Sequence, residues 1–141
     1  MATKADFTDE EWKALQKGVT GAGMLVSLSD RDFTDSFGES SALAKRLSHE
    51  REQGESELMR ELAAVKGTGF GVTDSPQEVE AETMEALGAA IETLTAKAPE
   101  EIDGYRRLVL STADAVAGAK GEVSAEETAA IDKITAALGP A

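Results

Sequence analysis

Apolar residues recur at intervals of three and four along most of this chain of 141 residues, and this spacing constrains the fold more than any other feature. It places apolar side chains on one face of an α-helix, and a neighbouring element must cover that face. The stripes are Trp12, Leu15, Val19, Ala22 and Val26, then Met84, Leu87, Ile91, Leu94 and Ala98, then Ile102, Tyr105, Val109, Thr112 and Val116, and finally Glu127, Ile131, Ile134 and Leu138. No run shows the alternation of a β-strand. The sequence therefore predicts an all-α bundle.

Helix starts and stops are also visible. Thr8 with Glu11, and Ser124 with Glu127, have the spacing of a capping box, and Pro76 suits the first position of a helix. Gly54, Gly67 and the pair Gly139–Pro140 supply stops. We expect six helices, over residues 9–29, 39–53, 55–66, 76–97, 100–119 and 125–138.

The length predicts one domain, over residues 1–141. We expect a flexible segment at 1–8 and a glycine-rich connecting loop at 67–75. This loop leaves only about 70 residues on either side, too few for two independent cores. The predicted core positions are Trp12, Val19, Leu87, Ile91, Val109, Ile131 and Ile134.

The negative net charge of the chain limits the kinds of partner that it can bind. The chain has 27 Asp and Glu against 14 Lys and Arg, which gives a net charge of -13. This balance argues against binding to nucleic acid or anionic lipid, because both depend on basic side chains that neutralise phosphate. The apolar runs are too short for a bilayer span, and no secretory signal opens the chain, so we expect a cytoplasmic protein without membrane insertion. Cations and basic proteins are the charged partners that fit.

Two segments share a pattern that indicates an internal repeat. The run 24–30 matches the run 108–114, and each is followed by a Gly-Glu pair, at Gly38–Glu39 and at Gly121–Glu122. The simplest interpretation is two degenerate helix-turn-helix units, each with an acidic turn.

The first acidic turn carries Asp30, Asp32, Asp35 and Glu39 within ten residues. Hard oxygen ligands at this density suit calcium or magnesium, so these four carboxylates are the first candidates for a divalent cation site. The alternative is structural. Carboxylates favour turns and the first turns of helices, where they accept backbone hydrogen bonds and complement the helix dipole.

The second acidic turn does not have the EF-hand pattern. With Gly121 at the sixth loop position, the first, third and fifth positions are Val116, Gly118 and Lys120, which offer no side-chain oxygen. A looser site remains open for three carboxylates, Asp114, Glu122 and Glu126.

Other chemistry finds little support. The run Gly67–Gly71 lacks the Gly-Lys-Ser/Thr ending of a phosphate loop and follows a predicted helix instead of a strand. His49, the single histidine, lies in a polar stretch typical of a surface residue, and the chain has no cysteine. Catalytic triads and histidine-based metal sites therefore have almost no residues to use, and we expect no enzyme.

The segment Ala117–Glu127, followed by Ala129, Ala130, Ile131, Ile134 and Leu138, resembles the repeat of the tellurite-resistance protein B family, the TerB-like helical domains. Lys120 stands where that family usually has Asp. The resemblance implies an all-helical domain with clustered carboxylates, linked to stress responses to metal oxyanions and to membrane-associated complexes.

These observations lead to one functional expectation and two alternatives. We expect a non-enzymatic TerB-like domain, a stress-associated scaffold that binds a protein partner or a divalent cation through its acidic face. One alternative is a metal-dependent hydrolase that uses carboxylates alone, which would need ligands from several helices. The other is a homo-oligomer joined through the small residues Ala129, Ala130, Ala136 and Ala137.

Overall fold

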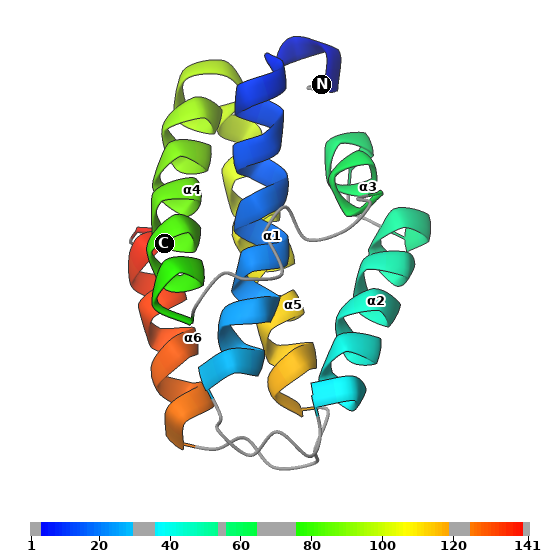
Figure 1. The fold of residues 1–141 in the computed structure, drawn as a ribbon. Helices are drawn as coiled ribbons and strands as arrows, with labels where there is room; N and C mark the ends of the chain where they lie inside the picture. The colour runs from blue at the N-terminus through cyan, green and yellow to red at the C-terminus, as the bar shows by residue number, and fades with distance from the viewer. Residues whose placement is uncertain (1–3, 30–35, 54–55, 65–75, 119–124, 140–141) are drawn as a thin grey trace.

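The computed structural model describes residues 4–29, 36–53, 56–64, 76–118 and 125–139, and within these ranges only the backbone course of 27–29, 36–44 and 76. These residues form six α-helices and two 3-10 turns, and no strand lies among them. The elements are η1 (Lys4–Asp6), α1 (Asp9–Ser29), α2 (Ser36–Gln53), α3 (Glu57–Ala63), α4 (Pro76–Lys97), η3 (Pro99–Glu101), α5 (Ile102–Ala117) and α6 (Ala125–Ala137) (Figure 1). The predicted all-α bundle of six helices is confirmed.

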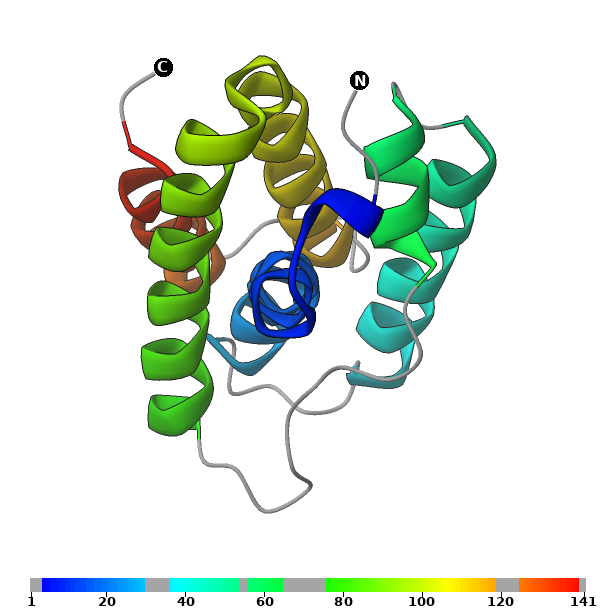
Figure 2. The same ribbon diagram turned by 90° about the horizontal axis from the view of Figure 1, so that it is seen from above.

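Helix α1 is the centre of the bundle. It contacts α4 most extensively, then α5 and α6, and it also touches α2 and α3. Seen from above, it stands in the middle of the other helices (Figure 2). From Gly18 to Val26 every residue is buried except Met24, which is partly exposed. A helix buried all round has neighbours on every side, and Gly18 lets Leu87 of α4 and Tyr105 of α5 approach closely.

Local signals set most helix ends. In the capping box that begins α1, the Thr8 amide donates to Glu11 Oε1 at 2.8 Å, and the Glu11 amide donates to Thr8 Oγ1 at 3.1 Å. Pro76 begins α4 as expected. After α6, Gly139 adopts a φ of 81°, a conformation that glycine tolerates best.

Three helices have bounds that differ from the expectation by more than one residue. Helix α2 begins at Ser36, three residues before the expected start at residue 39. Helix α3 spans only Glu57–Ala63, because Ser56 caps its start by accepting from the Met59 amide at 3.2 Å and Ala64 ends it. Helix α5 begins at Ile102, since Pro99 first directs the chain into the 3-10 turn η3.

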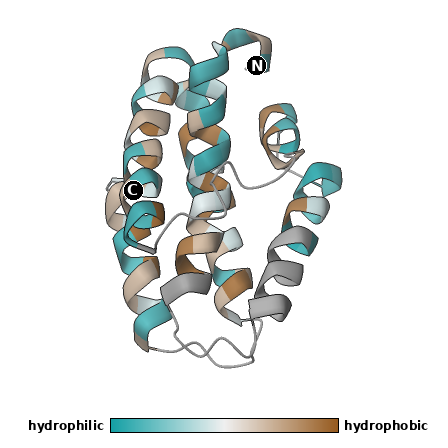
Figure 3. Cartoon of the chain, in the orientation of Figure 1, coloured by the Kyte–Doolittle hydropathy of each residue, from teal (hydrophilic) through white to brown (hydrophobic). Residues whose placement is uncertain are grey.

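The apolar core matches five of the seven predicted positions. Trp12, Val19, Leu87, Val109 and Ile134 are buried. Ile91 and Ile131 are only partly buried against the edge of the core, so the prediction was wrong for these two. Hydrophobic and hydrophilic residues both occur in successive turns of the helices, as expected for amphipathic helices with one apolar face (Figure 3).

Residues 4–8, within the segment 1–8 that we expected to be flexible, have a described conformation. From Lys4 on the chain forms the turn η1, Phe7 is buried at 9% exposure, and Thr8 caps α1. The Phe7 ring, just before the cap, packs against Trp12 in the first turns of α1, with 6.1 Å between the ring centroids. The connecting loop expected at 67–75 lies outside the described residues.

Candidate acidic site

Four helix ends that border the two acidic turns lie together. Helix α1 ends, α2 begins, α5 ends and α6 begins at the same end of the bundle, the lower end in Figure 1. We call this the acidic end. Its position follows from the order of the helices, because α1 and α5 both run toward it and α2 and α6 both leave it.

The carboxylates of the first turn are only partly located. Asp30, Asp32 and Asp35 lie outside the described residues. Glu39 belongs to the first turn of α2, of which the structure describes the backbone alone. The chain order nevertheless places Asp30 directly after Ser29, the last residue of α1.

The carboxylates of the second turn lie on two helices. Asp114 is exposed near the end of α5, and Glu126 is exposed in the first turn of α6. Glu122 lies between them, outside the described residues. Among the residues whose positions are described, no three Asp, Glu or His side chains are grouped closely enough to hold a metal ion. The described geometry therefore does not assemble a complete site from Asp114 and Glu126.

The two helices that end at the acidic end lack favourable charges at their C-termini. Neither α1 nor α5 has a basic residue in its last turn. A helix C-terminus carries partial negative charge and favours nearby cations, so an aspartate there is electrostatically unfavourable. Asp114 lies four residues from the end of α5, counting Ala117 as the first. The capping explanation, which fits carboxylates at helix starts, does not fit Asp114.

Glu127 is fully buried, at 0% exposure, in the first turn of α6. It occupies the helix face that also buries Ala130 and Ile134. The sequence placed it in an apolar stripe by its spacing, and also in a capping box with Ser124, which lies outside the described residues. Burial of a carboxylate costs free energy unless hydrogen bonds or an opposite charge compensate it.

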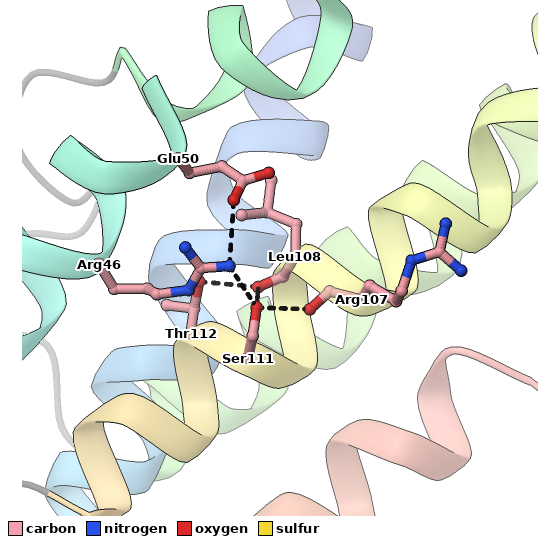
Figure 4. A network of polar contacts seen from close by, with 6 residues as sticks. All are labelled: Arg46, Glu50, Arg107, Leu108, Ser111 and Thr112. Carbon is pink, nitrogen blue, oxygen red and sulfur yellow. Dashed lines mark hydrogen bonds and ion pairs between the residues drawn. The ribbon is translucent and has the colours of Figure 1, made fainter. Parts of the chain in front are cut away.

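Two other buried carboxylates were not identified from the sequence. Glu50 of α2 forms an ion pair with Arg46, with 3.0 Å between Glu50 Oε2 and Arg46 Nη2. The same Arg46 Nη2 donates to Ser111 Oγ of α5 at 2.9 Å (Figure 4). The Ser111 hydroxyl in turn donates to the Arg107 carbonyl at 2.6 Å. This network ties α2 to α5. Its one sequence signal is the spacing of four between Arg46 and Glu50.

Glu101 provides a second link of this kind. It is the last residue of η3 and is buried at 7% exposure, and its Oε2 accepts from the Ser56 hydroxyl at 2.8 Å. Ser56 also caps α3, so one side chain fixes the start of α3 and connects it to the start of α5.

Tyr105 links two helices through a hydrogen bond from its hydroxyl to the backbone. Tyr105 is fully buried, its hydroxyl donates to the Leu15 carbonyl of α1 at 2.8 Å, and burial raises the pKa of that hydroxyl. A neutral hydroxyl already bonded to backbone is poorly suited to proton transfer. His49 is exposed on α2, as the sequence predicted.

Several polar side chains of the described residues thus join different helices, through the bonds from Arg46 to Ser111, from Ser56 to Glu101 and from Tyr105 to the Leu15 carbonyl. No helix in the described part of the chain is long and apolar enough to cross a membrane. Comparisons with protein-family models, with curated proteins and with solved structures gave no match to this chain.

Proposed function

We propose that this chain is a non-enzymatic helical scaffold of the TerB-like type whose acidic end binds a divalent cation, calcium or magnesium. The observation that carries the proposal is the meeting of two helix C-termini, α1 and α5, at the end of the bundle bordered by both acidic turns. Neither terminus has a basic residue in its last turn, and carboxylates occur at or near both. A bound cation would offset both the carboxylates and the two helix dipoles.

The scaffold part of the proposal is supported by the interior. Arg46, Glu50, Ser56 and Glu101 form hydrogen bonds or ion pairs that join helices, and Tyr105 bonds to backbone. These are the polar groups of a stable framework, and a stress-associated role of the kind that the TerB-like resemblance implies needs such a framework to present its acidic end.

Melting scans test whether a divalent cation binds to the folded protein. A ligand that binds only the folded state raises the midpoint, and at ten times its Kd the gain is about 1.4 kcal/mol, or roughly 5 °C for a domain of this size. The scans compare calcium, magnesium and manganese chlorides with sodium chloride at equal ionic strength. Any rise common to all four salts is general screening, and a rise specific to a divalent ion is binding.

Variants locate the site. We expect the double change Asp30→Asn with Asp32→Asn to abolish the calcium-specific rise, because the first turn has more carboxylates than the second. Glu126→Gln should leave the rise nearly intact. Glu92→Gln is the matched control, since Glu92 is an exposed carboxylate of α4 toward the opposite end of the bundle. Absence of heat in titration calorimetry at about 1 mM calcium, or loss of the heat by Glu126→Gln alone, would contradict the site.

A basic protein partner is the other occupant that the acidic end suits. The same double variant distinguishes the two, because Asp30→Asn with Asp32→Asn would abolish binding of a protein partner in calcium-free buffer as well.

The homo-oligomer alternative has fewer exposed alanines available for a contact than the sequence suggested. Ala130 is buried inside the bundle and Ala137 is partly buried, which leaves Ala129 and Ala136 exposed on α6. Sedimentation analysis measures this directly.

A further inference from the structure

The segment Lys4–Phe7, which we call the strap, crosses the end of the bundle opposite the acidic end (Figures 1 and 2). Its turn is closed by the Phe7 amide, which donates to the Lys4 carbonyl at 3.2 Å. Phe7 packs against the Trp12 ring, and the Lys4 ammonium lies 5.7 Å from the centre of the same ring. The strap therefore covers Trp12, which is only 6% exposed.

One side chain from a distant helix holds the strap in place. Lys97, the last residue of α4, places its Nζ 2.5 Å from Glu11 Oε1 and 3.3 Å from the Asp6 carbonyl. The same ammonium lies 5.9 Å from the centre of the Phe7 ring. Lys97 thus contacts the strap itself and also the glutamate that caps the start of α1.

Most of the strap is exposed to solvent. Lys4, Ala5 and Asp6 are exposed, and Phe7 is its only buried residue. Segments with few buried apolar contacts and exposed backbone open locally at a lower free energy than the core. In contrast, residues 18–26 of α1 are buried on nearly every side.

We propose that the strap is a conformational latch: it opens as a unit while the helical bundle stays folded, and the charge of Lys97 holds it closed. Opening removes Phe7 and Lys4 from Trp12 and exposes that ring at the end of the bundle. Any event that neutralises or engages Lys97 favours the open form.

Trp12 is the single tryptophan of the chain, so its fluorescence reports the latch without interference. The test variant is Lys97→Met, which keeps an unbranched apolar stem and removes the charge. The matched control is Lys133→Met, because Lys133 also forms an ion pair between helices, at 2.7 Å from Glu80, near the start of α4 and thus at the other end of that helix from Lys97.

Three measurements are compared: acrylamide quenching of Trp12, hydrogen exchange of the Phe7 amide, and helix content by circular dichroism. In Lys97→Met we expect the quenching constant to rise about twofold and the Phe7 amide to exchange about tenfold faster, at unchanged helix content. Lys133→Met should behave as wild type. Unchanged quenching and exchange in Lys97→Met, or an equal change in Lys133→Met, would overturn the proposal.

The wild-type protein supplies an independent test if Lys97→Met fails to fold. In native-state hydrogen exchange at low denaturant, a local opening exchanges the Phe7 amide at a rate that denaturant hardly changes, whereas the Val109 amide in the core needs global unfolding. If the Phe7 amide shows the same denaturant dependence as Val109, the strap does not open separately from the bundle.

Discussion

Tyr105 of α5 packs directly against Gly18 of α1. A methyl group at Gly18 would lie well inside van der Waals distance of Tyr105 Oη and 3.0 Å from Leu87 Cδ2. The hydroxyl is held there because it donates to the Leu15 carbonyl, on the same turn of α1. Because Gly18 has no side chain, the Tyr105 ring of α5 can pack directly against α1.

We expect Gly18→Ala to lower the free energy of unfolding by about 1 to 3 kcal/mol, although alanine in a helix interior is normally the more stable residue by about 1 kcal/mol. Tyr105→Phe alone should cost about 1 kcal/mol for the lost hydrogen bond. In the double variant the overlap with the hydroxyl is gone, so the two costs should not add. A denaturant-based double-mutant cycle checks this, and additivity within about 0.5 kcal/mol would contradict the contact.

Glu11 gives the molecule a titratable contact at the start of α1. The Lys97 ammonium, which donates to its carboxylate, and then the Thr8 amide hold the pKa of Glu11 below its ordinary value of 4.5. A carboxyl whose pKa is lower in the folded state stabilises that state above the unfolded pKa, and this contribution is lost as the pH falls through the folded pKa.

For Glu11→Gln we therefore expect lower stability than wild type at neutral pH. The difference between the two proteins should shrink as the pH falls below about 4.5 and vanish below the folded pKa. Chemical unfolding of both proteins over this pH range measures the difference. A gap that stays constant down to strongly acidic pH would show that the ionised form of Glu11 does not stabilise the fold.

Among the elements, α6 shows most clearly how burial follows the neighbours of a helix. Glu127, Ala130 and Ile134 form its buried face, whereas Ile131 lies at the edge of that face and is partly exposed. The spacing of three and four includes both isoleucines, but only one of them faces the centre of the bundle.

Ile134→Ala should cost about 2 to 5 kcal/mol through lost burial and the cavity left behind. Ile131→Ala should cost less, about 1 kcal/mol, because less of its surface leaves water on folding. Urea unfolding of the two variants compares them under one condition. An equal loss at both positions would mean that Ile131 is as buried as Ile134.

The whole molecule carries more negative charge than its basic residues offset. Lys17 pairs with Glu82 at 3.2 Å, Lys133 with Glu80 and Lys97 with Glu11, so three lysines already serve contacts between helices. With 27 acidic against 14 basic residues, many carboxylates repel one another at the surface.

We expect sodium chloride to raise the melting midpoint between low and about 0.2 M salt, because screening relieves this repulsion more than it weakens a few exposed ion pairs. Calorimetry or circular dichroism over a salt series measures the shift. A midpoint that falls with salt would mean that the ion pairs contribute more to stability than the repulsion removes.

Local patterns in the sequence determined where the helices lie. The bounds of α1 and α4 match the expectation at both ends, and their starts follow from the Thr8 capping box and Pro76, which act within one turn of helix. The stop at Gly139 is of the same kind. The candidate carboxylates could be identified by their density alone, and the helix order then places both acidic turns at one end of the bundle.

Only the tertiary structure decided which faces meet. The burial of residues 18–26 of α1 depends on helices that follow it in the chain. The fit of Tyr105 against Gly18, the link from Arg46 to Ser111 and the contact of Lys97 with the strap all join residues far apart in the chain. Periodicity identifies one apolar face of a helix, but the number and direction of its neighbours depend on how the helices pack together. For this reason Ile91 and Ile131, which have the same spacing as their buried neighbours, remain partly exposed to water.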